Sequence, residues 1–276
     1  MNKPLATLII SIYDNVQYLK AVLDCLKFQT EKRFEVIITE DAEHIHVKEF
    51  LQHYEYNGAL NHLSQPDIGW QKNKALNKAI LSANTDYLIF IDGDCILHPR
   101  FIEFHLKWAD NKSILAGKRI KLDSNSTDWL LEDLNRLPLF QKYLTKHYRD
   151  LKRNGAQFIE EGYFINPNGP LGLIPRIRGM YQLKGCNMSF SKEAIIAING
   201  FDMDYIRPAI GEDIDLTWRF EKAGYKLKSI RNICVQYHLY HKQNWLDQSE
   251  NIQIMKKKQD NNEVVCINGI SKLSEN

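Results

Sequence analysis

Three short apolar segments in the first 92 residues each run into acidic residues, and helix-like segments separate them. They are LATLIISIY (5–13), FEVIIT (34–39) and YLIFI (87–91). Near-continuous apolar character is typical of parallel strands that are covered on both faces. Alternation of such strands with helices predicts right-handed crossovers and a mostly parallel central sheet flanked by helices. We therefore expect an α/β fold whose ligands bind beyond the carboxyl ends of the strands.

The remaining predicted elements continue this alternation. Helices are expected at 16–26, at 73–83, after Pro99, at 191–198 with Ser191 as the N-cap, and at 211–225 with its end near Gly224. Further strands are expected at 113–120, 185–190 and 233–241. The last residues, about 25 of them, carry little periodicity, which indicates a loose tail.

Charge and cysteine content exclude several classes of protein. The net charge of +2 gives no reason to expect a nucleic-acid partner. Five scattered cysteines without a CxxC pair argue against a disulfide framework or a zinc site and favour a reducing compartment. Asp14 interrupts the first apolar run too early for a secretory signal, and no run reaches the roughly 18 apolar residues of a membrane span. We expect a soluble cytoplasmic protein, with peripheral contact to the inner face of the membrane left open.

Residues 121–182 differ in character from the segments around them. LLEDLNRLPLFQKYLTKHYRDLKR predicts one or two amphipathic helices with a basic face, and INPNGPLGLIPRIRG (165–179) predicts an ordered but adjustable loop. Between Lys142 and Lys184 there are eight Lys or Arg and three Asp or Glu. Such a region fits either an ordinary solvated face or a surface that meets anionic lipid or a lipid-diphosphate acceptor.

The motif Asp92-Gly93-Asp94 places two carboxylates directly after a buried strand. Acids at i and i+2 of an extended segment can face the same way, and Gly93 leaves room for a ligand beside the backbone. Mg²⁺ and Mn²⁺ prefer such oxygen ligands together with substrate phosphates. A turn in which Asp94 caps a helix is the alternative interpretation.

A second acidic motif, GEDIDL (211–216), opens a predicted helix. Asp213 can act there as a general base toward a sugar hydroxyl, although acids at a helix start also stabilise the helix through its macrodipole. Asp215 and Arg219 are four residues apart and can form a purely structural pair.

Two further motifs offer ligands for a metal and for a phosphate. Histidine is a common ligand of ions such as Mn²⁺, and YHLYH (237–241) contains two. Because residues three apart in a strand face opposite sides, only one of His238 and His241 is expected to bind. Lys72 and Lys74 lie near a predicted helix start, where a phosphate is bound well. An ordinary strand histidine and a solvated helix face are the alternatives.

Taken in order, these motifs resemble the nucleotide-sugar glycosyltransferases of GT-A fold, in particular the inverting family 2, with a second half similar to the galactosyltransferase-type C-terminal region. The resemblance covers roughly residues 5–242. It rests on LIISIYDN, LKFQTEKRFEVIITEDA, GWQKNKALNKAI, YLIFIDGDC, LKGCNMSFSKEAIIAINGFD, GEDIDLTWRFEKAGY and VQYHLYH.

The resemblance implies a role for each matched residue. Those implied to bind the donor are Tyr13 at the nucleotide base, Asp41 at the uracil ring, Asp92 and Asp94 at the ribose and the metal-bound diphosphate, Lys72 or Lys74 at the basic position of the third motif, and Gly185, Cys186 and Asn187 beside the donor sugar. Asp213 matches the catalytic base, and Glu212 matches its acceptor-orienting neighbour. His238, with His241 as second choice, matches a further ligand of the metal, Mn²⁺ or Mg²⁺, that Asp94 holds.

The sequence departs from the family pattern at two places. Glu40-Asp41-Ala42-Glu43 stands where two aspartates followed by Gly-Ser are usual. The segment before Glu212 is Arg207-Pro208-Ala209-Ile210-Gly211, where Trp-Gly-Gly is frequent. An aromatic residue there would stack on a sugar, so its replacement leaves the identity of the acceptor open.

The implied activity is inverting, metal-dependent transfer of a sugar from a UDP-sugar to a saccharide or lipid-linked saccharide, as in bacterial lipopolysaccharide or capsule biosynthesis. Such a displacement needs no covalent intermediate, so Cys95 and Cys186 are expected only to pack. Loop 165–179 would close over the donor. The implied regions are 1–120 for the nucleotide sugar, 121–182 as an insertion near the acceptor, 183–242 for the acceptor and catalysis, and 243–276 as the tail.

Two other functions are weighed against this one. A sugar nucleotidyltransferase would carry a Gly-rich, Arg-containing loop after the first strand, and SIYDNVQYL contains no glycine there. A non-catalytic nucleotide-sugar-binding module would be favoured by the loss of Asp94 or Asp213, and both are present.

Overall fold

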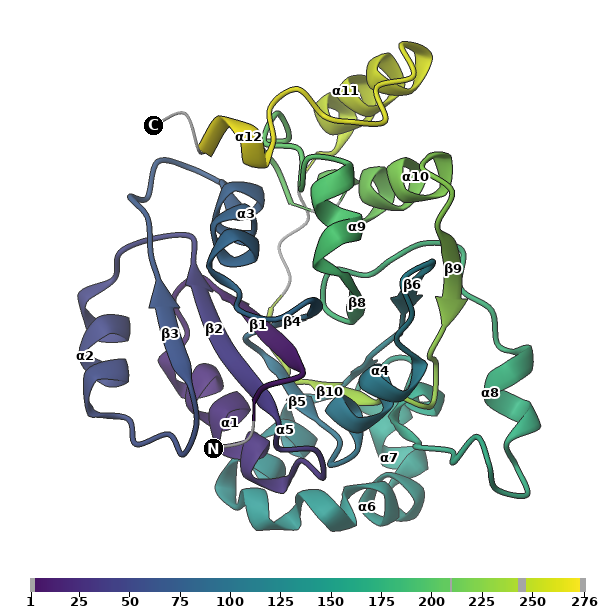
Figure 1. The fold of residues 1–276 in the computed structure, drawn as a ribbon. Helices are drawn as coiled ribbons and strands as arrows, with labels where there is room; N and C mark the ends of the chain where they lie inside the picture. Colours follow the sequence, from purple (N-terminus) through teal and green to yellow (C-terminus); the bar gives the residue numbers. More distant parts are fainter. Residues whose placement is uncertain (1–2, 209, 243–246, 274–276) are drawn as a thin grey trace.

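The computed structural model describes residues 3–208, 210–242 and 247–273, apart from the side chain of Glu212. Its large sheet contains β1 (Ala6–Ile12), β2 (Phe34–Glu40), β3 (Leu60–Leu63), β4 (Tyr87–Asp92), β6 (Ser113–Ala116), β8 (Met188–Ser191) and β9 (Lys226–Ser229). The strand order is β3-β2-β1-β4-β8-β6-β9 (Figure 1). Within this sheet β8 runs antiparallel to both of its neighbours, and the other pairs are parallel. The predicted α/β fold with a mostly parallel sheet is confirmed.

A small sheet beside the large one contains β5 (Cys95–Leu97), β10 (Gln236–His238) and β7 (Ile120–Lys121), in that order. The prediction of one strand over 113–120 is wrong, because the chain leaves the large sheet after Ala116 and joins the small sheet as β7. At the break, a Cβ on Gly117 would lie 2.3 Å from Nδ2 of Asn187, so only glycine fits. The predicted strand 233–241 is likewise reduced to the three residues of β10.

Helices connect these strands and cover the sheet. They are α1 (Val16–Cys25), η1 (Leu26–Phe28), α2 (Ile45–His53), α3 (Lys72–Ser82), α4 (Phe101–Trp108), α5 (Ser124–Glu132), η2 (Leu134–Leu139), α6 (Phe140–Lys146), α7 (Tyr148–Arg153), η3 (Ile159–Gly162), α8 (Leu173–Ile177), α9 (Lys192–Ala197), the π-helical turn η4 (Ile210–Ile214), α10 (Asp215–Lys222), α11 (Ser249–Asp260) and α12 (Ile270–Leu273). Ser191 caps α9 by accepting a hydrogen bond from the amide of Ala194, and Gly224 follows α10 with φ of +90°, both as predicted. No helix in the described part of the chain is long and apolar enough to cross a membrane.

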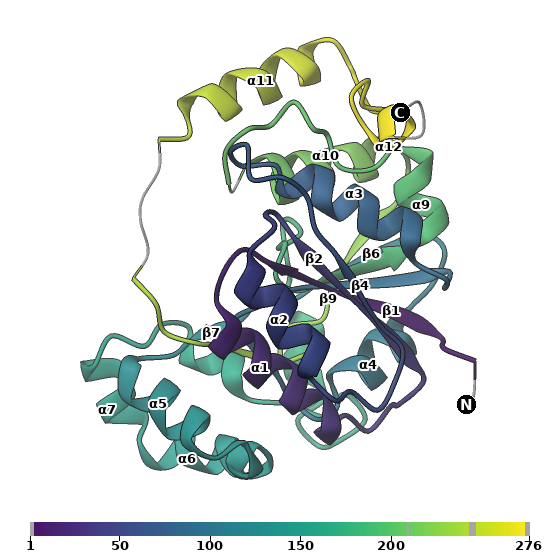
Figure 2. The same cartoon turned by 90° about the vertical axis from the view of Figure 1, so that its left-hand side faces the viewer.

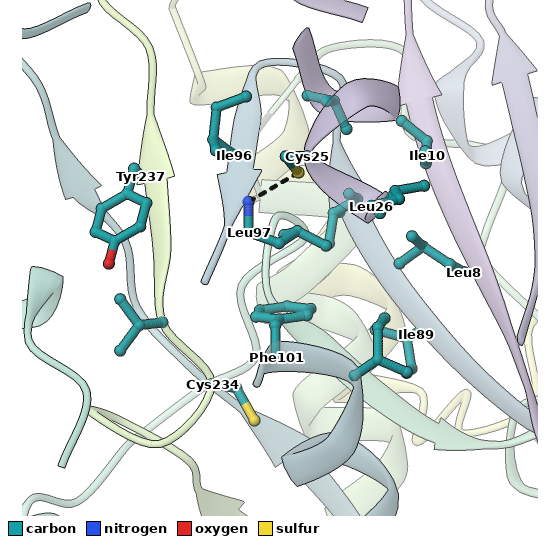
Figure 3. Close-up of a cluster of buried hydrophobic side chains, with 14 of the residues drawn as sticks. Leu8, Ile10, Cys25, Leu26, Ile89, Ile96, Leu97, Phe101, Cys234 and Tyr237 are labelled. Atoms are coloured by element: carbon teal, nitrogen blue, oxygen red, sulfur yellow. Dashed lines mark hydrogen bonds between the residues drawn. The ribbon is translucent and has the colours of Figure 1, made fainter. Parts of the chain in front are cut away.

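Alternation of side chains along β1 builds a core on each face of the large sheet. Leu8 and Ile10 face a core shared with α1, α4 and the small sheet, part of which Figure 3 shows. Ile9 faces the opposite core, which is shared with α3, α9 and α10. Figure 2 shows these two groups of helices on opposite sides of the sheet. All three side chains are fully buried, which explains why the sequence of this strand is apolar without alternation.

The C-terminal region is folded, so the prediction of a loose tail is wrong. Ile270 of α12 belongs to the core that contains α3, and α12 lies against that helix. Helix α11 is held by Lys258, whose Nζ lies 2.8 Å from Oδ2 of Asp202 and 2.6 Å from Oδ2 of Asp204. Helix α11 has no buried apolar stripe to recognise, because its buried residues are the polar Lys258 and Asn251.

The stretch 130–153, predicted as one or two amphipathic helices, is helical but divided into the end of α5, the turn η2, α6 and α7, and η3 follows it. The segment 165–179, predicted as a loop, contains the short helix α8. Arg178, just after α8, is bound to Glu161 of η3 at 2.9 Å, so this segment is tied to the end of the helical region. The division of the chain at residues 120, 182 and 242 stays a prediction.

Candidate active site

A cavity of about 790 Å³ opens at the carboxyl ends of β1, β2 and β4. It brings together the predicted site residues Tyr13, Asp41, Lys72, Asp92, Asp94, His238 and His241. Among the other residues that line it are several that the sequence did not single out as site residues, including Asp14, Tyr18, Asp67, Trp70 and Arg119. The cavity therefore lies where an open α/β sheet is expected to bind ligands.

The register of the parallel strands explains why the acids meet. Ser11 of β1 pairs with Asp92 of β4, so the DGD motif begins level with the end of β1. The amide of Gly93 then donates to the carbonyl of Ser11 at 2.8 Å. A Cβ on Gly93 would lie only 2.3 Å from Cγ2 of Ile12, so glycine is required for this close approach of the two backbones.

Asp92 is held between two cations. Its Oδ1 accepts from Nζ of Lys72 at 3.0 Å, and its Oδ2 accepts from Nη1 of Arg119 at 2.8 Å. Burial opposes ionisation of this carboxyl, but the charges of Lys72 and Arg119 outweigh it and lower the pKa of Asp92. Asp92 is thus an ionised carboxylate whose two oxygens organise the cations of the cavity.

Asp94 faces two histidines. Its Oδ2 lies 3.2 Å from Nε2 of His238 and 3.2 Å from Nε2 of His241. Burial opposes ionisation here too, but the hydrogen bonds from the two imidazoles hold the pKa of Asp94 well below its usual range. The hydrogen bond that His241 donates to Asp94 raises the pKa of His241.

The prediction that only one of the two histidines faces the site is wrong. It assumed that the strand continues through residue 241, whereas β10 ends at His238. Beyond that point the amide of Tyr240 donates to Oγ1 of Thr127, and the hydroxyl of Tyr18 donates to the carbonyl of Tyr240. The alternation of a strand is lost in this loop, and both imidazoles turn toward Asp94.

The donor atoms of this trio have the spacing of a metal site. Oδ2 of Asp94 and the two Nε2 atoms lie 3.2–3.3 Å from one another. Neighbouring ligands of an ion with bonds of about 2.1 Å and octahedral angles are about 3 Å apart. One carboxylate and two imidazoles suit a divalent transition ion, so these residues fit the metal that the resemblance implied.

Asp41 and Tyr13, from the loops after β2 and β1, also line the cavity. Oδ1 of Asp41 accepts from Nε2 of Gln65 at 2.7 Å, and Oδ2 accepts from the amide of Gln71 at 2.8 Å. Burial raises the pKa of Asp41, although these two hydrogen bonds oppose the shift. Tyr13 is 53% exposed, and its hydroxyl donates to Asp67 at 2.8 Å, which presents the ring to the cavity.

Five predicted donor or catalytic residues whose side chains or backbone the structure describes do not line this cavity: Lys74, Gly185, Cys186, Asn187 and Asp213. Lys74 lines a separate surface hollow with Lys78. Asn187 is fully buried, and its Nδ2 donates to the carbonyls of Lys118 and Cys234. Asn187 thus holds the backbone immediately before Arg119. Cys95 and Cys186 are buried, in keeping with the packing role expected for them.

Asp213 lies in the π-helical turn η4, which precedes α10. Its carboxylate is 13% exposed, and Nζ of Lys184 lies 3.9 Å from its Oδ2. The side chain of Glu212, the predicted neighbour of the base, lies outside the described part of the structure. The next acid is different: Asp215 is buried, accepting from the hydroxyl of Tyr205 at 2.9 Å and from Nε of Arg219 at 2.7 Å. These contacts agree with the structural pair that the four-residue spacing of Asp215 and Arg219 predicts.

Arg119 is the most consequential residue that sequence reasoning missed. The available signal was the glycine in AGKRI, which follows a buried strand and is itself followed by two cations. Because β6 ends at Ala116 and not at Ile120, Lys118 and Arg119 lie in a loop that follows the carboxyl end of this strand. That loop delivers the guanidinium of Arg119 to Asp92.

Comparison with known proteins agrees with the fold. The glycosyl transferase family 2 model matches residues 7–166, and a model described as the N-terminal domain of galactosyltransferase matches residues 176–242. The first match covers more than half of the chain. The chain therefore belongs to glycosyl transferase family 2, a family of glycosyltransferase enzymes.

Curated relatives are named as polysaccharide enzymes. The hyaluronan synthase of Pasteurella multocida is 23% identical over 240 residues, which are 84% of this chain and 24% of that protein. The amylovoran biosynthesis glycosyltransferase AmsB of Erwinia amylovora is 23% identical over 241 residues, which are 84% of this chain and 69% of that protein. The chain thus spans about a quarter of the length of the first relative and about two thirds of the second.

Solved structures of the same fold include two with bound nucleotide sugars. The mannosyltransferase PcManGT from Pyrobaculum calidifontis, in complex with GDP-Man and Mn²⁺, has a TM-score of 0.57 at 15% identity over 93% of this chain and 61% of that one. S. aureus TarS 1-349, in complex with UDP-GlcNAc, has a TM-score of 0.58 at 11% identity over 92% and 65%. At these identities the likeness establishes the GT-A fold.

Proposed function

We propose that the protein is an inverting, metal-dependent glycosyltransferase that moves a sugar from a UDP-sugar to a saccharide or lipid-linked saccharide acceptor. One observation carries the proposal. A single cavity holds a carboxylate and aromatic end suited to a base, a pair of cations suited to a diphosphate, and a carboxylate with two imidazoles suited to a divalent ion. The three groups of residues lie in one cavity, as binding of a nucleoside diphosphate together with a divalent ion would require.

The residues of the cavity divide the donor between them. Asp41 accepts a hydrogen bond from the uracil N–H, since each carboxylate oxygen can accept more than one, and Tyr13 packs against the ring. Lys72 and Arg119 meet the diphosphate, because both are held toward the cavity by Asp92. Asp94, His238 and His241 hold Mn²⁺ or Mg²⁺. When bound, such an ion counters the charge that builds on the departing diphosphate.

Asp213 is proposed as the base of the transfer. It takes the proton of an acceptor hydroxyl while the hydroxyl oxygen forms a bond to the anomeric carbon of the sugar. The bond from that carbon to the diphosphate breaks at the same time, and UDP leaves with the electron pair. Attack opposite the leaving group inverts the anomeric centre. The family motif and the low exposure of this carboxylate support the assignment.

The acceptor and the setting are assigned more broadly. The names of the relatives, a hyaluronan synthase and an amylovoran biosynthesis enzyme, support a role in surface polysaccharide assembly such as lipopolysaccharide or capsule. We place the protein in the cytoplasm, where nucleotide sugars are made. The match to family 2 argues against the sugar nucleotidyltransferase alternative, and the filled set of site residues argues against a non-catalytic module.

Calorimetric titration of UDP with and without Mn²⁺, followed by a screen of UDP-sugars for slow hydrolysis, tests the proposal. We expect UDP to bind more tightly with Mn²⁺, and Asp94→Asn to abolish that gain together with hydrolysis. Asp110→Asn is a matched control, because Asp110 pairs with Lys228 outside the cavity. Metal-independent UDP binding with no hydrolysis of any UDP-sugar would instead establish a binding module.

A further inference from the structure

Helix α8 and its flanks expose large apolar side chains that nothing in the described chain covers. Leu171 is 60% exposed, Leu173 68%, Ile177 73% and Tyr181 95%. Leu173, Ile174 and Ile177 are spaced i, i+1 and i+4, so they share one face of the helix. Figure 1 shows α8 at the right-hand edge of the molecule, beyond β9, the edge strand of the large sheet. We call this set, with Arg176, the α8 tip.

The base of the α8 tip is anchored, so the exposure is built into the fold. Nη1 of Arg178 donates to Oδ1 of Asn232, and Nη2 donates to Oε1 of Glu161. Oγ of Ser229, at the end of β9, donates to the carbonyl of Arg178. These contacts fix the tip beside β9 and η3. No residue of 165–181 lines the active-site cavity.

The α8 tip itself carries one cation and no acid, and the exposed acid Glu160 lies at its base, 3.6 Å from Nη2 of Arg178. The sequence carries no Asp or Glu between Glu161 and Glu193, while Arg176, Arg178, Lys184 and Lys192 fall in that interval. Glu161 itself is buried and bound by Arg178 and Arg231. Arg176 is exposed on α8 directly before Ile177. Exposed leucine and isoleucine are thus accompanied by arginine and by a tyrosine, a residue enriched at membrane interfaces.

We infer that the α8 tip is a membrane-docking surface for an anionic bilayer. Leu173, Ile174 and Ile177 enter the boundary between head groups and acyl chains, while Arg176 meets lipid phosphates. Shallow insertion of an apolar face combined with cationic attraction gives reversible binding that depends on anionic lipid. A bilayer suits this surface better than a protein partner because a bilayer requires no complementary shape from the exposed side chains. The inference rests on α8 alone and not on the proposed glycosyl transfer.

The test uses the full chain with Ile177→Cys labelled by an environment-sensitive fluorophore. The five native cysteines are buried, so the label goes to the new thiol. Asn111→Cys, at an exposed turn on the rim of another surface hollow, is the matched control. With phosphatidylcholine vesicles that contain about 30% phosphatidylglycerol we expect a blue shift and an increase in emission at position 177 only. Pure phosphatidylcholine should give at most a small response, and 0.5 M salt should weaken binding, by screening over about 4–5 Å.

The double variant Leu173→Asp/Ile177→Asp separates docking from folding. We expect its partition onto the anionic vesicles to fall at least about tenfold, with thermal unfolding and UDP binding unchanged. Three outcomes would overturn the inference. They are no vesicle response at position 177, a response to UDP and Mn²⁺ without vesicles, which would make the segment a lid, and self-association in the ultracentrifuge that the double variant abolishes.

Discussion

Nη1 of Arg119 donates to Oδ2 of Asp92 at 2.8 Å, so the charge of the first carboxylate of the DGD motif is balanced within the protein. Lys72 occupies the other oxygen. The second carboxylate, Asp94, instead faces two imidazoles. Under the proposed function the two carboxylates have different roles: Asp92 would orient the cations toward the donor, and Asp94 would be the carboxylate ligand for a metal.

Replacing Arg119 by alanine should weaken binding of UDP much more than binding of uridine. A hydrogen bond to a charged group contributes about 1.5–3 kcal/mol, which corresponds to roughly a 10- to 200-fold loss of affinity for UDP. Calorimetric titration with both ligands measures the difference. Lys74→Ala is the control and should change neither affinity, because Lys74 lines a separate hollow. Equal losses for uridine and UDP would show that Arg119 supports the cavity and does not meet the diphosphate.

Both histidines should contribute to metal affinity. Two imidazole ligands favour a transition ion over Mg²⁺, so the wild-type protein with UDP should bind Mn²⁺ more tightly than Mg²⁺. His238→Gln and His241→Gln should each reduce Mn²⁺ affinity at least about tenfold, which corresponds to 1.4 kcal/mol. Electron paramagnetic resonance of bound Mn²⁺ reports the affinity without an activity assay. Unchanged Mn²⁺ affinity in His241→Gln would show that His238 is the single histidine ligand.

Replacing Asp213 by asparagine should separate binding from chemistry. Loss of a general base typically lowers turnover 10²- to 10⁴-fold, about the range we expect here, while UDP affinity with Mn²⁺ stays as in the wild type. Asp215→Asn is the informative comparison, since that acid is buried with Tyr205 and Arg219 and its loss should lower thermal stability. If Asp213→Asn retains turnover with an identified acceptor, another residue is the base.

Replacing Gly93 by alanine should displace the backbone of the DGD motif and so distort the site. The added methyl would lie 2.3 Å from Ile12, and overpacking of this kind costs about 1–3 kcal/mol. For a chain of this size the melting temperature should fall by roughly 2–12 °C, and UDP affinity should fall with it. Gly179→Ala provides the matched control, because a methyl there meets no atom within 4 Å. Equal melting temperatures for the two variants would contradict the predicted clash.

The positions of the acids were predictable from the sequence because they depend on local order. An apolar strand that is buried on both faces is easy to recognise, and the residue after it must lie at the carboxyl edge of a parallel sheet. Asp41, Asp92 and Asp94 follow from that rule. The helix cap at Ser191 and the end near Gly224 follow from equally local chemistry.

Features that depend on distant contacts could not be predicted in this way. His241 reaches Asp94 because the chain leaves β10 early and bonds to Thr127. Arg119 reaches Asp92 because Asn187, far along the chain, fits against Gly117 and ends a strand. Neither Thr127 nor Asn187 can be recognised as a partner from the local sequence. The sequence alone therefore favours His238 over His241 and does not indicate Arg119.

The matched family regions end at residue 242, but the cation that balances Asp202 comes from Lys258 in α11. Asp202 is fully buried, and removing the partner of a buried charge costs about 3–5 kcal/mol. A protein truncated at residue 242 would therefore lose the cation that pairs with Asp202. The folded region continues beyond residue 242, where the matched family regions end. Activity studies should use all 276 residues.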